Sequence, residues 1–254
     1  MTPVLHTRSL AAGYRHRTLL ADVDISLMPG QLAVLAGANG SGKSTLLRTL
    51  TGAARPLSGT VEIDGRDIRQ YSRRNLARRL AVVLTERGGG GALTVEECVA
   101  IGRHPHTGSF GHLGSEDRSI VAKAIADVGM AGMEKRYTGT LSDGERQKVM
   151  VARALAQQSG LIVLDEPTAF LDVAGRSDIM RLLRRLADGG CTILLSSHDI
   201  AASFAVADRL LITDPARQRL FCGTVSEAVR EGALDRAFAG SGLRFDPAKG
   251  DYSY

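Results

Sequence analysis

One short segment constrains the fold of this chain more than any other. Residues 37–44 read GANGSGKS and match the pattern G-x-x-x-x-G-K-[ST], between an apolar run, Leu32–Leu35, and a helical pattern that starts near Ser44. Glycines let successive backbone N–H groups turn toward one centre, and a helix N-terminus adds its positive dipole end. The alternative is a glycine-rich turn with a chance lysine, and average residue frequencies give such a match on the order of 1 % of the time. The sequence therefore predicts a phosphate-binding loop.

The side chains of this loop indicate its chemistry. Lys43 is expected to reach the β- and γ-phosphates of a nucleotide, and the Ser44 hydroxyl is expected to bind Mg²⁺. The residues expected to hold ATP here are Asn39, Gly40, Ser41, Gly42, Lys43, Ser44 and Thr45.

The order of apolar patterns predicts an α/β fold. Residues 4–35 have the pattern of short strands, and residues 59–65 that of a strand ending in an Asp-Gly turn. Two further apolar strands, 161–164 and 192–196, flank a helix over 179–187. This alternation favours a core with a mostly parallel sheet and an antiparallel β subdomain at its front.

Between these strands, the residues from about 86 to 155 are mostly helical, with a break at Gly102–Gly114. No internal repeat is visible. We expect a single domain over residues 1–254, with a helical subdomain at approximately 86–158.

Composition narrows the class of protein. The chain is 44 % hydrophobic and 23 % charged, as compact globular proteins are. Its apolar runs stop short of the roughly 20 residues that a membrane-spanning helix needs. The N-terminus has no charged region followed by an apolar stretch, so we expect no signal peptide and a cytoplasmic location. The three cysteines lack a CxxC spacing, which favours reduced, packed thiols over disulfides or a metal site.

Charge alone does not discriminate between functions. A net charge of +5 suits nucleic acid, anionic lipid or an ordinary soluble surface. Six arginines cluster between Arg66 and Arg79. A solvated helix face explains them better than a nucleic-acid site, because aromatic residues are scarce. We therefore expect no nucleic-acid partner.

The strand Leu161–Leu164 ends in two adjacent carboxylates, Asp165 and Glu166. Successive side chains of an extended backbone point to opposite sides, so the two can serve separate tasks. We assign Asp165 to Mg²⁺, through water, and Glu166 to the general base or polariser of the water that attacks the γ-phosphate. An isolated Asp-Glu pair is more often a solvated loop or helix cap, and the upstream phosphate loop makes this pair informative.

Residues 141–147, LSDGERQ, resemble the LSGGQ signature of the ABC (ATP-binding cassette) ATPases. In that family the signature of one subunit closes on the ATP held by the phosphate loop of the other. The resemblance therefore implies a head-to-tail homodimer with Ser142 and Gly144 at the nucleotide. Asp143 and Glu145 depart from the LSGGQ pattern, whereas the serine and the second glycine are in place. From the residues alone, Ser142 and Glu145 form a capping box at a helix start, which is compatible with the signature role.

Three further positions carry the resemblance. Tyr14 resembles the aromatic residue that stacks on adenine, Asp172 the D-loop aspartate, and His198 the switch histidine near the γ-phosphate. Taken alone, Tyr14 is more often core or surface filler, and a lone histidine is more often structural. His198 follows an apolar strand, at the carboxyl end of a parallel sheet, and this favours its functional interpretation.

One position departs from the family. The family usually has a glutamine at the end of the strand that enters the helical subdomain, where it contacts Mg²⁺ and water and senses the membrane partner. Residues 80–87 read LAVVLTER, which places Thr85 or Glu86 there. Either could give an oxygen to the metal, and we take Thr85 as a candidate Mg²⁺ ligand beside Ser44 and Asp165. The run Gly88–Gly91 is costly to order and is expected to be a mobile loop.

The resemblance covers essentially the whole chain and implies an ATP hydrolase that uses ATP and Mg²⁺ to drive transport. A single cassette implies separate integral membrane permease subunits, an indirect substrate-binding protein, and a peripheral position on the cytoplasmic face of the inner membrane. Residues 93–108, which include a Gly-Arg-x-Pro stretch at 102–105, and residues 243–246 look like the ATPases of importers for iron-siderophores, haem and cobalamin. The solute is not expected to touch this subunit.

Other functions stay open. An exporter or lipid-transport ATPase would carry the same motifs. A non-transport ABC ATPase acting on DNA or the ribosome would typically carry coiled-coil insertions or two cassettes, and the sequence shows neither. A phosphate-loop kinase or GTPase predicts no signature, and the guanine-specifying Asn-Lys-x-Asp is absent. A non-hydrolysing regulatory module is a further alternative, because the family glutamine is missing.

Overall fold

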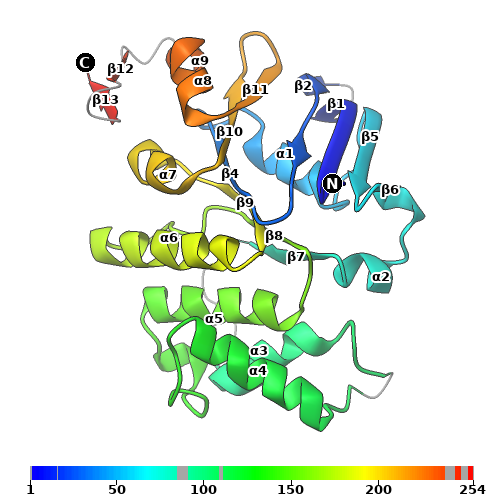
Figure 1. Ribbon diagram of the computed structural model, residues 1–254, viewed down its shortest axis with the longest axis vertical. Helices are drawn as coiled ribbons and strands as arrows, with labels where there is room; N and C mark the ends of the chain where they lie inside the picture. The colour runs from blue at the N-terminus through cyan, green and yellow to red at the C-terminus, as the bar shows by residue number, and fades with distance from the viewer. Residues whose placement is uncertain are drawn as a thin grey trace.

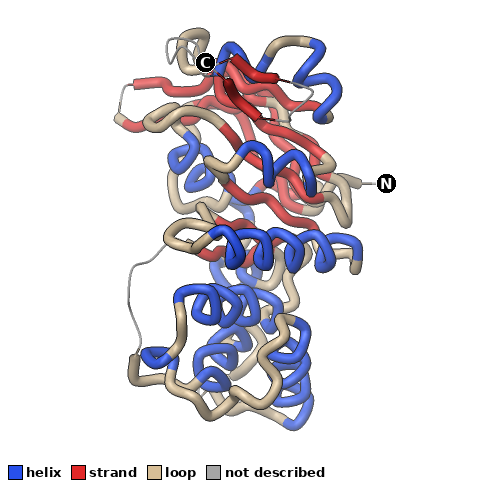
Figure 2. The backbone as a smooth tube through the Cα atoms, turned by 90° about the vertical axis from the view of Figure 1, so that its left-hand side faces the viewer, coloured by secondary structure: helices blue, strands red, loops and turns tan. Residues whose placement is uncertain are grey.

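The computed structural model describes residues 2–15, 17–84, 91–108, 111–237, 244–246 and 251–253. Strands gather in one half of the molecule, and the other half is helical, as Figure 2 shows. The helical half contains α3 (Val95–Ala100), α4 (Ser115–Asp127) and α5 (Asp143–Ala156), drawn in green at the bottom of Figure 1.

The central sheet is built from six strands. They are β4 (Leu32–Ala36), β7 (Leu80–Val83), β8 (Leu161–Leu164), β9 (Thr192–Ser196), β10 (Arg209–Asp214) and β11 (Arg219–Gly223). Their order is β11-β10-β4-β9-β8-β7, and every neighbouring pair is parallel except β10–β11 at one edge. The strands β7 and β8 have four residues each, and β4 and β9 have five. They are strongly apolar, because other elements cover both faces of the sheet.

A second, antiparallel sheet lies beside the first. Its strands are β1 (Leu5–Tyr14), β2 (Arg17–Val23), β3 (Ser26–Leu27), β5 (Ser58–Ile63) and β6 (Arg66–Asp67). Their order is β2-β1-β5-β6, and β3 pairs with β1. Figure 1 shows this sheet in blue and cyan at the upper right, beside helix α1 and away from the helical half.

The remaining elements connect and cover the sheets. They are α1 (Lys43–Leu50), α2 (Arg73–Ala77), α6 (Val173–Asp188), α7 (Ile200–Val206), α8 (Val225–Arg230), α9 (Ala233–Ala237), the 3-10 turns η1 (Ile68–Gln70), η2 (Ile101–Arg103) and η3 (Thr138–Thr140), and the hairpin β12 (Arg244–Asp246) and β13 (Asp251–Ser253). Among the helices in the described ranges, none is long and apolar enough to cross a membrane.

Alternate residues of the central strands enter two different apolar cores. Leu32, Val34 and Ala36 pack toward the helical half, whereas Ala33 and Leu35 pack toward α1 and the antiparallel sheet. This division follows from the period of two that a strand imposes on its side chains. The strand β4 is therefore held on both faces, and this fixes the start of the loop at residues 37–44.

The predicted α/β arrangement, with its parallel core and antiparallel front, is confirmed by these two sheets. The helix predicted over 179–187 starts earlier, at Val173, because Asp172 caps it by accepting a hydrogen bond from Gly175 N at 2.7 Å. The strands β10 and β11 were not predicted, although the apolar run Leu210–Ile212 is a signal for one of them. Thr85, Glu86 and most of the glycine run Gly88–Gly91 lie outside the described residues.

Candidate active site

The loop at residues 37–44 follows β4, and two of its glycines shape it. Gly37 has φ +147°, and a Cβ there would lie 1.9 Å from Thr213 Oγ1. Thr213, on β10, donates a hydrogen bond to Ser41 Oγ at 2.7 Å. Gly42 has φ +99° and caps α1. Any other residue at Gly37 or Gly42 would strain the backbone, so both positions require glycine.

The Lys43 side chain is buried against this loop. Its Nζ donates hydrogen bonds to Gly37 O at 2.8 Å and to Ala38 O at 3.0 Å. Burial lowers the pKa of Lys43, while Coulombic attraction by Glu166 and Asp165 acts in the opposite direction. The ammonium group is therefore held within the loop, where it could neutralise a phosphate.

The N-terminal end of α1 provides donors beside this ammonium. The first N–H groups of a helix point out of its N-terminus without an intrahelical acceptor. At α1 they belong to Lys43, Ser44 and Thr45. Asn39, Gly40 and Ser44 are exposed, so the rim of the loop is accessible to a ligand. The arrangement suits an anion at the helix N-terminus.

Three neighbouring parallel strands bring the predicted residues to one edge of the sheet. The phosphate loop follows β4, His198 follows β9, and the acidic pair follows β8. The strand ends are aligned, because Leu35 is paired with Ser196 and Leu164 with Leu195. Ligands of open α/β sheets bind at the carboxyl ends of their strands, and the structure places these residues there.

A serine that the sequence reasoning missed joins the two carboxylates. Ser196 is fully buried at the end of β9, and its Oγ donates a hydrogen bond to Asp165 Oδ1 at 2.7 Å. The same Oγ accepts a hydrogen bond from Glu166 N at 2.8 Å. Ser196 thus holds Asp165 by its side chain and Glu166 by its backbone. A small polar residue at the end of an apolar strand was the available signal.

The backbone at the acidic pair differs from the extended form that was assumed. The strand β8 stops at Leu164, and Glu166 has φ +47°, in the left-handed region. The two carboxylates therefore follow a turn in the chain and do not alternate along a strand. The prediction of an extended backbone at Asp165 and Glu166 was wrong. A non-glycine residue in this region is strained, and the Ser196 hydrogen bond helps to hold it.

Glu166 also contacts the predicted switch histidine. His198 Nε2 lies 2.6 Å from Glu166 Oε1, and both side chains are partly exposed. An ionised carboxylate only accepts, so the contact is a hydrogen bond when Nε2 carries a proton. The pair is placed to orient a water or to hold a proton at Glu166 Oε1.

Two of the three predicted Mg²⁺ ligands, Ser44 and Asp165, lie in the described part of the chain. Hydroxyl and carboxylate oxygens are donors that Mg²⁺ accepts, and Mg²⁺ usually keeps several waters and phosphate oxygens in its shell. Two protein oxygens leave the rest of such a shell to waters and phosphate oxygens, so the donor set fits a Mg²⁺ that arrives with a nucleotide. Thr85, the third predicted ligand, lies outside the described residues.

Tyr14 ends β1 in the hairpin that runs beside the loop. Its side chain is 53 % exposed, and it pairs with Arg17 across the hairpin. A Cβ at Gly42 would lie 3.3 Å from Leu19, on the same hairpin. An exposed ring on the hairpin that contacts the loop is available for stacking on a base.

The residues of the signature-like segment start helix α5. Ser142 Oγ accepts a hydrogen bond from Glu145 N at 3.2 Å, and Glu145 Oε2 accepts one from Ser142 N at 2.8 Å. The predicted capping box is confirmed. The hydrogen bond from the Ser142 backbone is the main cause that lowers the pKa of Glu145. The other departure from LSGGQ, Asp143, forms an ion pair with Arg146 at 2.8 Å.

A groove of about 410 Å³ brings the signature-like segment next to the start of α6. Ser142 and Gly144 line it at the start of α5, and Phe170 and Asp172 line it from the segment before α6. Phe170 is 55 % exposed and has φ +67°. Apart from Tyr14 on the hairpin and Thr85 outside the described residues, the predicted site residues thus fall into two groups, one at the carboxyl edge of the sheet and one along this groove.

Comparison with known proteins agrees with this geometry. Residues 20–169 match the family model described as ABC transporter. The chain belongs to the ABC transporter family. ABC transporter ATP-binding proteins hydrolyse ATP to power transport, so the expected enzyme class is confirmed.

Relatives of this ABC transporter chain include several import proteins. The iron(3+)-hydroxamate import ATP-binding protein FhuC of Bacillus subtilis is 41 % identical over 79 % of this chain and 76 % of its own length. The hemin import ATP-binding protein HmuV of Streptomyces coelicolor is 37 % identical, over 87 % and 78 %. The cobalamin import ATP-binding protein BtuD of Halobacterium salinarum is 38 % identical, over 78 % of this chain and 50 % of that protein.

A solved structure shares the fold. A subunit of the cbiONQ ABC transporter complex of Clostridium perfringens superposes with a TM-score of 0.79 and 26 % identity, over 94 % of this chain and 95 % of that chain. The expected fold, a phosphate-loop ABC ATPase core with an antiparallel β subdomain and a helical part, is confirmed.

Proposed function

We propose that this chain is the ATP-hydrolysing subunit that powers uptake of an iron chelate, a siderophore or haem, or of cobalamin through a separate membrane permease. The observation that carries this proposal is that three relatives, 37–41 % identical over most of the chain, are named as import ATP-binding proteins for iron(3+)-hydroxamate, hemin and cobalamin. The chain acts from the cytoplasmic face of the membrane, peripherally, beneath the permease subunits and indirectly with a substrate-binding protein.

The two groups of site residues support a head-to-tail homodimer. Lys43, Asp165 and Glu166 lie at the sheet edge, whereas Ser142 and Gly144 line the groove with Asp172. In the proposed dimer, the groove end of one copy closes on the nucleotide held by the loop of the other. The helical subdomain, approximately 86–158, would move with its signature end toward that nucleotide.

The roles of the residues follow from their chemistry. Lys43 and the first N–H groups of α1 neutralise the β- and γ-phosphates, and Tyr14 stacks on the base. Glu166, oriented by His198 and Ser196, accepts a proton from the attacking water. Ser44 and Asp165 would hold Mg²⁺, which would supply positive charge to the phosphate oxygens when bound. The first helical turn of α5, with Ser142, adds donors from the other copy.

Dimer formation tests the nucleotide part of this proposal. Glu166→Gln should slow hydrolysis and leave an ATP-bound dimer that sedimentation velocity detects as a doubling of mass. The matched control is Glu166→Gln combined with Lys43→Ala, which should remain monomeric because the phosphate charge is no longer neutralised. A Glu166→Gln protein that stays monomeric in saturating ATP would contradict the composite site.

Uptake tests the transport part. A strain of the source organism that lacks this chain should lose accumulation of a radiolabelled ferric siderophore, haem or cobalamin. The wild-type chain should restore uptake, and the Lys43→Ala chain should not. Unchanged uptake of all three solutes would contradict the import assignment while leaving the ATPase assignment intact.

A further inference from the structure

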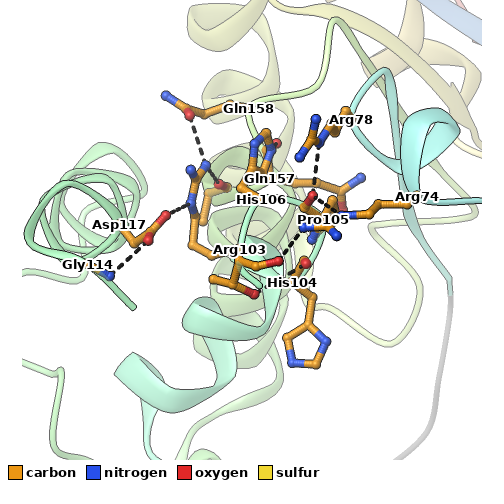
Figure 3. A network of polar contacts seen from close by, with 12 residues as sticks. Arg74, Arg78, Arg103, His104, Pro105, His106, Gly114, Asp117, Gln157 and Gln158 are labelled. Atoms are coloured by element: carbon orange, nitrogen blue, oxygen red, sulfur yellow. Dashed lines mark hydrogen bonds and ion pairs between the residues drawn. The ribbon is translucent and has the colours of Figure 1, made fainter. Parts of the chain in front are cut away.

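A dense set of polar contacts surrounds the C-terminal end of α5, with the Arg103 guanidinium at its centre (Figure 3). Arg103 is 5 % exposed. Its Nε donates to Asp117 Oδ1 at 2.9 Å, on α4. Its Nη1 donates at 2.8 Å to Ala156 O and to Gln158 Oε1, at the end of α5. One planar group therefore ties η2, α4 and α5 together.

The backbone around Arg103 packs directly on α5. A Cβ at Gly102 would lie 2.2 Å from Arg153 O, so this position accepts glycine only. His106 Nε2 lies 2.8 Å from Gln157 O, a carbonyl that can only accept, so the histidine donates. The Gly-Arg-x-Pro stretch is thus a close-packed seat for the last turn of α5.

The arginine cluster of α2 is tied to the same seat. Arg74 Nε and Arg78 Nε donate to Pro105 O at 3.0 and 2.9 Å, and Arg74 also donates to Thr107 O. Gln157 Nε2 donates to Leu80 O at 2.8 Å, at the start of β7. The two arginines therefore tie α2 to the segment after η2, and Gln157 ties the end of α5 to the core sheet.

Three further arginines of the cluster also have partners within the chain. Arg69 forms an ion pair with Asp67 at 2.6 Å, Arg79 with Asp64 at 3.4 Å, and Arg66 lies over the Tyr71 ring at 4.9 Å. Five of the six arginines therefore have contacts within the described part of the chain.

The geometry of α5 relates this seat to the signature. The helix has 14 residues, with Ser142 at its N-terminus and the Arg103 contacts at its C-terminal end. At about 1.5 Å per residue the two ends are about 21 Å apart, so a tilt of about 3° around the seat moves Ser142 by about 1 Å. A misplacement of that size can cost roughly a hundredfold in rate.

We propose that Arg103 is a positioning residue for the signature. It fixes the C-terminal end of α5, and thereby the direction in which the helix presents Ser142 to the nucleotide held by the other copy. The contacts of Arg74 and Arg78 to Pro105 carry any shift of α2 to the same point, and the contact of Gln157 to Leu80 carries any shift of β7. This inference rests on the proposed composite ATP dimer and adds a residue that does not touch the nucleotide.

The test measures ATP-dependent dimerisation in the Glu166→Gln background. Adding Arg103→Ala should weaken the dimer about tenfold or more, because α5 loses its seat. Binding of ATP to the dilute monomer should stay within about twofold, because the phosphate loop is unchanged. Arg73→Ala, on the exposed side of α2, is the matched arginine control and should leave both quantities unchanged.

A double-mutant cycle with Ser142→Ala distinguishes positioning from general destabilisation. If Arg103 acts through Ser142, the two effects on dimerisation are non-additive, since Arg103→Ala has little left to remove once Ser142 is gone. Additive effects, or an unchanged dimer constant in Arg103→Ala, would overturn the proposal.

Three other outcomes have distinct meanings. If Arg103→Ala does not fold, Arg103→Lys carries the same cycle, because lysine keeps the charge beside Asp117 and lacks the fork that reaches α5. If the Glu166→Gln protein alone forms no ATP dimer, the proposed composite function fails and the positioning role fails with it. If that dimer forms and only the cycle is additive, the positioning role alone is wrong.

Discussion

Replacing Ser196 with alanine removes one hydroxyl that contacts both site carboxylates. Ser196 Oγ donates to Asp165 Oδ1 at 2.7 Å and accepts from Glu166 N at 2.8 Å, and the residue is fully buried. Alanine occupies the same space without the hydroxyl, so the change removes these two hydrogen bonds and little packing. We expect a loss of both stability and turnover.

The expected magnitudes follow from the two bonds. A buried donor or acceptor that loses its partner costs about 1–3 kcal/mol, so we expect the free energy of unfolding to fall by about 2 kcal/mol. For a chain of this size that lowers Tm by roughly 4–8 °C. Glu166 has φ +47° and relies on this bond, so its carboxylate should shift and kcat should fall about 10–100-fold.

The assay compares Ser196→Ala with Ser197→Ala. Ser197 is also buried, but its hydroxyl contacts Asp199 and not the site carboxylates. Thermal unfolding, ATP affinity and steady-state turnover are measured for both. Ser196→Ala should lose turnover at unchanged ATP affinity, whereas Ser197→Ala should lose stability alone. Equal turnover in the two variants would refute the role of Ser196.

Three further experiments test the phosphate loop, the cap of helix α5 and the cysteine thiols. Gly37→Ala should abolish binding of a fluorescent ATP analogue, because the added Cβ would lie 1.9 Å from Thr213 Oγ1. Gly40→Ala should weaken binding less, because no atom lies within 4 Å of a Cβ there. Equal effects of the two changes would contradict the loop geometry. Glu145→Ala should cost about 1 kcal/mol of stability at neutral pH by removing the capping box. Because the pKa of Glu145 is lowered, this stability difference between wild type and Glu145→Ala is present above the ordinary glutamate pKa of about 4.3 and is lost as pH falls through the lowered pKa. Denaturant unfolding at several pH values measures the difference, and a difference that does not change with pH would disprove the prediction. Desolvation raises the pKa of the three thiols, of which Cys98 is buried and Cys191 and Cys222 are partly buried. Labelling of the native protein by a thiol reagent should therefore be slow at pH 7 and rise toward pH 10. Rapid labelling at pH 7 would contradict the raised pKa values.

The parts of the fold that sequence patterns predicted are those with local signals. The phosphate loop, its flanking strand and helix, and the Ser142–Glu145 capping box each occupy a few consecutive residues, so their patterns are visible without the fold. The positions of Tyr14, Asp172 and His198 are consistent with their predicted roles, and those roles stay predictions.

The parts that were not predicted depend on contacts between distant segments. Ser196 lies about 30 residues from the acidic pair, and Thr213 lies 172 residues from Ser41, so neither contact has a local pattern. The positive φ of Glu166 is set by the turn after β8, which apolar periodicity does not describe. The Arg103 contacts likewise appear only when η2, α4 and α5 pack together.

The central claim is that two copies of this chain form one ATP-hydrolysing site from the loop of one and the signature of the other. The most direct test is complementation between Lys43→Ala and Ser142→Ala chains, each measured alone and then mixed in equal amounts with Mg²⁺ and ATP. Each variant alone should be nearly inactive. The mixture should recover activity, because a heterodimer contains one site with an intact loop and an intact signature. A mixture no more active than its components, in a protein whose wild type hydrolyses ATP, would contradict the shared site.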